Sequence, residues 1–135
     1  MKLLMIYCDR FAWTPGTKSI PDAPEARAGD LAKLVAGWVQ VEQEDADREG
    51  KVMTKLVKNL KWLAGKNGTK RIVLHSFSHL SESKAAPELS QAWLDRAKER
   101  LEGSGYEVYQ TPWGYFLDLH MDAPGHPLAR VFKSF

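Results

Sequence analysis

Two histidines and four serines follow a short apolar run near the middle of this 135-residue sequence. The run is Ile72-Val-Leu74, and the polar residues after it are His75, Ser76, Ser78, His79, Ser81 and Ser83. Imidazole and hydroxyl groups can act as bases, hydrogen-bond donors or nucleophiles. Because chemistry is often carried on loops held by rigid elements, we predict a site between this strand and a helix that begins at Pro87.

The spacing of His75 and His79 would point both rings at one metal ion if they lay on a helix. They follow a strand-like run instead, and Ser76 stands where the zinc metalloproteases have a glutamate. We therefore predict no metal ion and no other cofactor. The sequence also lacks a Gly-x-Ser-x-Gly elbow, a Walker loop and a dinucleotide fingerprint. His79 keeps two interpretations, a base or donor at a pocket mouth and a histidine that ties the loop to a backbone carbonyl.

Composition predicts one soluble globular domain over residues 1–135, with 44% hydrophobic and 27% charged residues. No apolar run approaches the length of a membrane span, so we predict no membrane contact. The single cysteine, Cys8, lies in the apolar opening and is expected to be a buried thiol in a reducing, cytoplasmic setting. The net charge of +2 is unevenly spread, because residues 51–135 hold thirteen Lys/Arg against eight Asp/Glu. A basic face is therefore possible.

Hydrophobic periodicity predicts the elements that would position the site. We predict strands at residues 2–8, 71–74, 106–108 and 115–122, and an extended surface loop from Asp9 to Gly29. Residues 31–42 fit either a strand or a helical turn followed by a strand. Helices are predicted after the acidic cluster at 42–49, ending near Gly65, and from Pro87 to Glu102, with a short terminal helix over 128–135. This order predicts an α/β (α+β) fold, a mixed sheet covered by two main helices.

The first of these helices has lysines at positions 51, 55, 58 and 61, which form a stripe away from its apolar face. A solvated surface is the simpler interpretation, and a track for an RNA backbone is the alternative. The acidic residues before the helix suit its N-terminal end and lack the spacing of a calcium loop.

Three motifs together resemble a known family. They are His79-Leu-Ser81 followed by Pro87, Pro112-Trp-Gly-Tyr-Phe116, and Gly125-His-Pro-Leu-Ala129. In this order and spacing they resemble the archaeal N-terminal editing domain of threonyl-tRNA synthetase, over nearly the whole chain. The resemblance implies a fold similar to D-aminoacyl-tRNA deacylases, a homodimer, and hydrolysis of L-seryl-tRNA(Thr) made in error. The partners it implies are the serine-bearing 3′-terminal adenosine of tRNA(Thr) and a threonyl-tRNA synthetase catalytic module.

The same resemblance implies a substrate-binding pocket and an assisting catalytic role for His79. The pocket residues are Val41, Ser76, Phe77, Ser78, His79, Pro112, Trp113, Gly114, Tyr115, Phe116 and Leu117. Two side chains depart from the family, because Leu117 stands in place of a lysine and Arg130 in place of a glutamate. We therefore hypothesise that the tRNA 2′-hydroxyl supplies the chemistry that these side chains do not.

Two other functions stay open at the level of sequence. A non-catalytic docking domain would use the pocket only to bind the tRNA acceptor end or a partner synthetase. A D-aminoacyl-tRNA deacylase would use the same fold on other esters. In none of these cases do we expect a ligase core within 135 residues, whether the chain is a piece of a synthetase or acts in trans.

Overall fold

The structure is a computed structural model that describes residues 1–135. Six strands, two α-helices and two short 3-10 helices follow one another along the chain. In order they are β1 (Lys2–Lys18), β2 (Gly29–Gln40), η1 (Gln43–Arg48), α1 (Glu49–Lys66), β3 (Arg71–Ser76), α2 (Pro87–Gly103), β4 (Glu107–Gln110), β5 (Tyr115–Asp122), η2 (Pro127–Ala129) and β6 (Arg130–Ser134).

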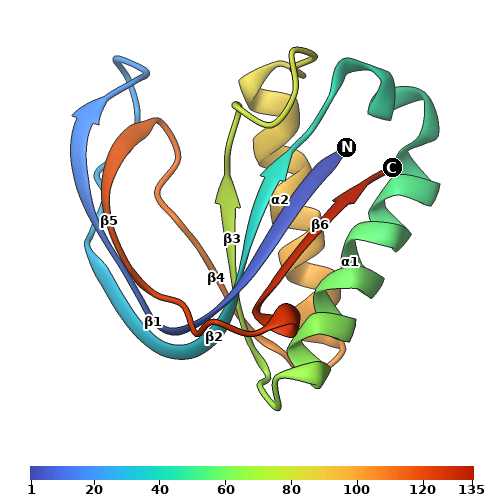
Figure 1. Ribbon diagram of the computed structural model, residues 1–135. Helices are drawn as coiled ribbons and strands as arrows, with labels where there is room; N and C mark the ends of the chain where they lie inside the picture. The colour runs from blue at the N-terminus through green and yellow to red at the C-terminus, as the bar shows by residue number, and fades with distance from the viewer.

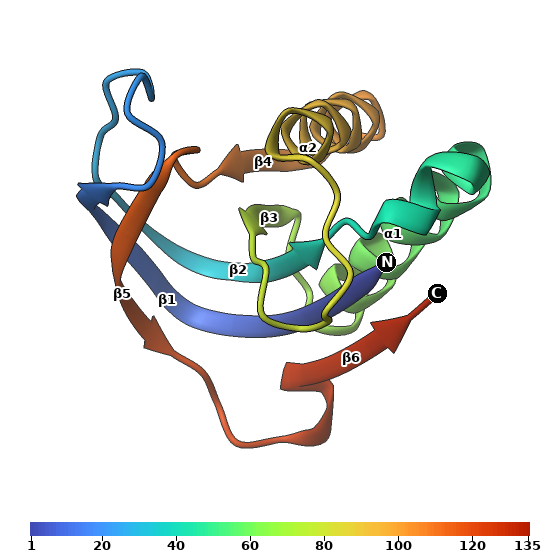
Figure 2. The ribbon, with the colours of Figure 1, turned by 90° about the horizontal axis from the view of Figure 1, so that it is seen from above.

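All six strands belong to one mixed sheet with the order β4-β3-β2-β1-β5. β2, β3 and β4 are parallel to one another, whereas β1 runs antiparallel to β2, β5 and β6. The long β1 pairs with β6 along residues 2–6 and with β5 along residues 10–18. The sheet curls strongly, so that β5 bends back toward β3 and β4, as Figures 1 and 2 show. This curl creates the concave side on which the predicted site residues meet.

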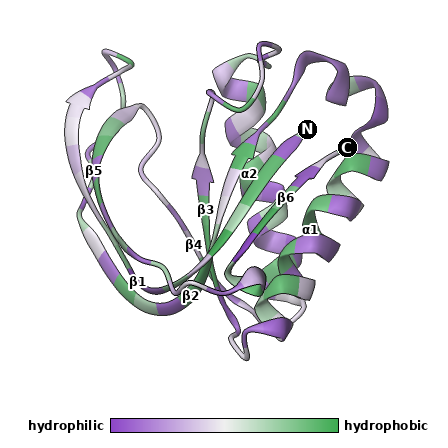
Figure 3. Cartoon of the chain, viewed as in Figure 1, coloured by the Kyte–Doolittle hydropathy of each residue, from purple (hydrophilic) through white to green (hydrophobic).

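Both helices cover the same face of β1 to β4. The main core contains the apolar side of α1, including Leu56, Leu60 and Leu63, together with Trp93 and Leu101 of α2 and the facing strand residues. In Figure 3 hydrophobic and hydrophilic positions alternate along α1, as expected for a helix with one buried side. A smaller core fills the inside of the curl and includes Phe11, Trp13, Leu34 and Val73. Because the central strands are buried on both faces of the sheet, their sequences are nearly continuous apolar runs.

The prediction of a mixed sheet with two main helices is confirmed. α1 and α2 lie where periodicity placed them, and α2 begins with Pro87 as its first residue. The alternation in β5 is also confirmed, since Leu117, Leu119 and Met121 pack against the smaller core. Cys8 is fully buried. Burial and the nearby carboxylates of Asp9 and Asp122 raise the pKa of its thiol to about 12, so it stays protonated.

Three sequence-based predictions are wrong. The segment from Asp9 to Lys18 continues β1 instead of forming a loop. Pro15 is tolerated because β2 begins at Gly29, opposite Trp13, so the stretch after Trp13 is paired on one side only. Residues 29–40 form a strand throughout, without a helical turn at the start. The terminal residues form η2 and β6, not a helix, because the first half of β1 offers an open edge that β6 fills.

No helix of this chain is long and apolar enough to cross a membrane.

Candidate functional site

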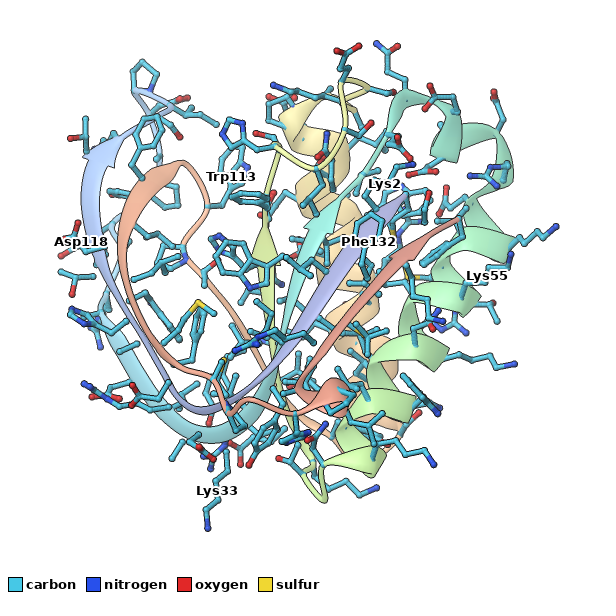
Figure 4. All side chains as sticks on the ribbon, in the orientation of Figure 1. Lys2, Lys33, Lys55, Trp113, Asp118 and Phe132 are labelled. Atoms are coloured by element: carbon cyan, nitrogen blue, oxygen red, sulfur yellow. The ribbon has the colours of Figure 1, made fainter.

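A cleft of about 750 Å³ lies on the concave side of the curled sheet. One wall is the segment after β3, and the other is the turn that leads into β5, where Trp113 is labelled in Figure 4. The cleft includes every residue that the family resemblance assigned to the pocket: Val41, Ser76, Phe77, Ser78, His79, Pro112, Trp113, Gly114, Tyr115, Phe116 and Leu117. Ser19 and Ile20, which follow β1, close one end.

The wall after β3 is held by one buried amide. Gln40 is 1% exposed, and its Nε2 atom donates to the carbonyl oxygens of Ser81 (2.8 Å) and Ser83 (3.0 Å). Its Oε1 atom accepts a hydrogen bond of 2.6 Å from the N–H of Leu80. A buried amide with three such bonds fixes a segment that has no helix or strand of its own. Gln40 therefore sets the shape of this wall.

The opposite wall depends on a glycine. Gly114 has a φ of 83°, and a Cβ atom at this position would lie 2.6 Å from the Cβ of Ala23. Its carbonyl oxygen accepts a hydrogen bond of 2.8 Å from the N–H of Ser19, and the hydroxyl of Tyr115 donates to the carbonyl oxygen of Pro24 at 2.8 Å. Only glycine fits both the left-handed backbone and the close contact. The segment after β1 thus braces the turn that enters β5.

Aromatic rings line the floor of the cleft in a connected row. Trp38 contacts His75 and Phe77 edge to face, with ring centroids 4.6 and 4.9 Å apart. Phe77 in turn contacts His79 at 5.3 Å, and this last ring is exposed at the mouth. The indole nitrogen of Trp38 is buried without a hydrogen-bond partner. A cleft with an apolar, aromatic floor suits an organic ligand that carries a few polar atoms.

His75 lies at the back of the cleft, where it is 8% exposed. Its Nδ1 atom is 2.9 Å from the hydroxyl oxygen of Thr111. Burial lowers the pKa of His75 to about 4, so the ring is neutral at neutral pH. A neutral imidazole bonded to a hydroxyl is a structural group here, in contrast to the exposed His79.

The lowered pKa of His75 has a consequence for stability. The unfolded chain binds a proton near pH 6.5, whereas the folded chain does so only near pH 4. Stability is therefore present in full above pH 6.5 and is lost as the pH falls through that value. Between about pH 7 and pH 5 we expect the free energy of unfolding to drop by about 2 kcal/mol. In a His75→Gln variant, followed by urea unfolding, this drop should be absent; an equal drop would contradict the assignment.

A second buried network lies behind the loop and joins it to the start of the chain. The Met1 ammonium donates to Glu42 Oε1 (2.7 Å) and to Asp45 Oδ1 (2.8 Å), and Glu42 Oε2 accepts from the hydroxyl of Ser81 at 2.6 Å. Burial alone would raise the pKa of Glu42, but the bonds from Met1, Ser81 and Lys2 outweigh it and lower the pKa to about 2. The acidic cluster thus supports the loop through Glu42 and Asp45.

The two departures from the family pattern lie in different places. Leu117, where the resemblance led us to expect a lysine, lines the cleft, so this position holds an apolar side chain. Arg130 is exposed at the start of β6 and is not among the residues that line the cleft. The Gly125–Ala129 motif joins β5 to β6, where Ala129 is fully buried and the carbonyl oxygen of Leu128 accepts from Asn67. Its role within this chain is structural.

Several residues that line the cleft were not among the predicted pocket residues, and four of them have polar groups buried beneath the walls: Trp38, Gln40, His75 and Thr111. Gln40 had a usable signal, since a lone amide inside the apolar run from Val39 to Val41 needs buried partners. No three His, Cys, Asp or Glu side chains come together in a way that could hold a metal ion.

The whole chain, residues 1–135, matches the family described as the archaea-specific editing domain of threonyl-tRNA synthetase. The chain belongs to this family. The editing domain is 30% identical to the threonine–tRNA ligase of Thermococcus kodakarensis over 99% of its own length, and 31% identical to that of Cenarchaeum symbiosum over 98%. It covers 22% and 21% of those two ligases, so it spans about a fifth of the length of these relatives.

The fold of the editing domain also occurs in a solved structure named c-Myc DNA unwinding element binding protein. The two align with a TM-score of 0.68 over 100% of the editing domain and 99% of the other chain. Their sequences are 11% identical, so the likeness shows a shared fold alone.

Proposed function

We propose that this editing domain hydrolyses the ester of L-serine wrongly attached to tRNA(Thr), as the editing module of a threonyl-tRNA synthetase or in trans to one. The observation that carries the proposal is the cleft between the two walls, in a chain that belongs to an editing family. Serine lacks one methyl group of threonine, and a difference of that size gives discrimination of only about 1–3 kcal/mol. A separate hydrolytic site completes the sorting.

The cleft has a suitable size and lining for the end of an aminoacyl-tRNA. Its volume of about 750 Å³ lies within the range of about 300–1,000 Å³ that small-molecule sites occupy. The 3′-terminal adenosine would lie between Phe77 and the 112–117 turn, where Phe116 is 66% exposed and offers a free ring for stacking. The Phe77 N–H already donates to the carbonyl oxygen of Val39 at 3.0 Å, so the N–H of Ser78 would be the donor of this wall that faces the ester and stabilises the oxyanion.

The titratable side chains of the cleft favour catalysis assisted by the substrate. They are His75, His79, Lys84 and Tyr115, and no carboxylate is among the lining residues. His75 is neutral and bonded to Thr111, and Leu117 offers no charge. In the proposed step water attacks the seryl carbonyl carbon and the bond to the 3′ oxygen breaks. The 2′-hydroxyl accepts the proton from water and passes one to the departing 3′ oxygen, so the products are serine and a free 3′-hydroxyl.

The proposal is tested by following ester loss from L-seryl-, L-threonyl- and D-aminoacyl-tRNA with the full chain. Rapid loss of L-serine alone, with threonine left in place, is the expected result, because we propose that a backbone wall of the cleft excludes the extra methyl group of threonine. Loss of none of the esters would identify a docking domain instead. Loss of the D-esters would identify a D-aminoacyl-tRNA deacylase.

His79 is exposed at the cleft mouth, where we propose that it assists catalysis through the adenosine or the attacking water. If it acts in the chemical step, His79→Ala should lower kcat by about 100-fold, in the range typical of a general acid or base. If it only anchors the substrate, KM rises and kcat stays constant. His120→Ala is the matched control, since His120 lies on the exposed face of β5, outside the cleft.

We further propose that the domain forms a homodimer and docks with a synthetase catalytic module. Leu4 and Phe132 are paired across β1 and β6 on the sheet face that the helices leave uncovered, and Phe132 is 51% exposed. This apolar strip suits a second copy of the same face. Sedimentation velocity should give a dimer for the wild type and a monomer for Phe132→Asp; a wild-type monomer at tens of micromolar would contradict it.

A further inference from the structure

Positive charge is concentrated in one part of the chain. Residues 50–81 contain seven Lys/Arg and no Asp or Glu, whereas the rest of the chain contains twelve Lys/Arg and seventeen Asp/Glu. Five of the seven cations lie on α1. The small net charge of the whole chain therefore hides a strongly basic helix.

Four of the five cations of α1 lie in one row along the helix, and Lys61 of the predicted stripe lies to one side of it. Lys51, Lys55, Lys58 and Lys66 follow one another at helical spacings, and Trp62 completes the row. All five side chains are exposed, although Trp62 is large and apolar and is 42% exposed. We call this row the α1 basic face. Figure 4 shows Lys55 extending from α1 into solvent.

β6 adds a further cation and an aromatic ring beside this face, as the positions of β6 and α1 in Figures 1 and 2 indicate. The Lys133 ammonium lies 5.9 Å from the centre of the Trp62 ring, and that of Lys55 lies 6.0 Å from the ring of Phe135. Cation–aromatic pairs of this kind place ammonium groups and ring surfaces together.

No carboxylate neutralises the α1 basic face. None of its lysines takes part in an ion pair, and Glu49, at the start of α1, is paired with Arg96 of α2 instead. The four lysines of this face, together with Lys133, are like charges that repel one another, and a polyanion would relieve that repulsion. An exposed tryptophan among them adds a surface that can contact a ribose or a base.

We propose that the α1 basic face, with Lys133, binds the phosphate backbone of RNA outside the acceptor end. This inference rests on the proposed function in one respect: it takes the bound RNA to be the tRNA whose 3′ end enters the cleft. Duplex RNA is contacted mainly through phosphates and 2′-hydroxyls, which suits flexible lysines on one helix side. The face would hold the tRNA body while the cleft holds the aminoacyl end.

The test uses a fluorescein-labelled tRNA(Thr) transcript that lacks its terminal CCA, so that it cannot fill the cleft. Fluorescence anisotropy with the full chain should give a binding constant that weakens with salt. For Lys55→Glu/Lys58→Glu we expect at least 10-fold weaker binding, and a log–log salt slope smaller by about 2, one for each lost phosphate contact. Trp62→Ala should weaken binding by about 5-fold or more with the salt slope unchanged.

The matched control is Lys98→Glu/Arg100→Glu, which makes the same charge change on α2. RNA binding that is unchanged in the α1 double variant would overturn the proposal, and it is the result expected if the face docks a protein instead. RNA binding that is reduced equally by the α2 double variant would also overturn it. Deacylation is a separate readout, because the α1 variant should raise KM for seryl-tRNA and leave kcat unchanged. If the wild type cleaves no ester, the proposed function fails while the anisotropy still tests the face.

Discussion

Replacing Gln40 by leucine is expected to disable the cleft and destabilise the domain. The variant keeps the volume of the side chain but loses its three hydrogen bonds, which leaves the N–H of Leu80 and the carbonyl groups of Ser81 and Ser83 without their partner. Unpaired polar groups in a partly buried segment cost about 1–3 kcal/mol each. We expect the free energy of unfolding to fall by about 3 kcal/mol, and deacylation to fall at least 100-fold as the wall after β3 loses its shape.

Urea unfolding and single-turnover deacylation measure the two effects of Gln40→Leu separately. Gln43→Leu is the matched control, because Gln43 is exposed and makes no side-chain hydrogen bond within the chain. Retained activity, with a change in unfolding free energy below about 0.5 kcal/mol, would show that the wall holds its shape without Gln40.

A tRNA whose terminal adenosine lacks its 2′-hydroxyl is expected to resist hydrolysis. The cleft contains no carboxylate, its buried histidine is neutral and already bonded, and Leu117 carries no charge. His79 is the remaining cleft residue for which we propose a role in the chemical step, and we propose that it assists the 2′-hydroxyl without replacing its proton transfer. We expect the rate of ester loss at saturating substrate to fall by about 10²–10⁴-fold, the usual range for losing an acid–base group.

The control for this substrate removes the 2′-hydroxyl from the neighbouring cytidine instead, which alters the RNA equally without touching the reacting ester. Competition between the two deoxy substrates reports whether binding is preserved. Undiminished hydrolysis of the terminal deoxy substrate would assign the chemistry to the protein, with His79 as the first residue to examine.

The helices could be predicted from the sequence because local periodicity decides them. Met53, Leu56, Leu60 and Leu63 recur on one side of α1, and that pattern needs no knowledge of other segments. The outer half of β1 and the whole of β6 could not be predicted, because their structure depends on pairing with distant strands. Pro15 and the turn-forming residues around it predicted a loop, because the local sequence gives no information about the pairing with β5.

The cleft could be predicted only in part. Its two walls follow from the resemblance to the editing family, and the structure brings those segments together. The residues beneath them, Gln40, His75 and Thr111, come together because β2, β3 and β4 are neighbours in the sheet, and the sequence alone did not show that pairing. Sequence spacing contains no sign of the curl of the sheet or of the two strands, β5 and β6, that pair with the same edge of β1.

The most direct test of the cleft as the site of the seryl ester is to locate a bound analogue. A non-hydrolysable 3′-seryl-amido adenosine would be titrated into the isotope-labelled chain and followed by amide chemical shifts. The expected result is saturable shifts at Ser76, Phe77, Gly114 and Phe116, with the amides of α1 unchanged. Shifts confined to other surfaces, or none at millimolar analogue, would contradict the assignment of this cleft.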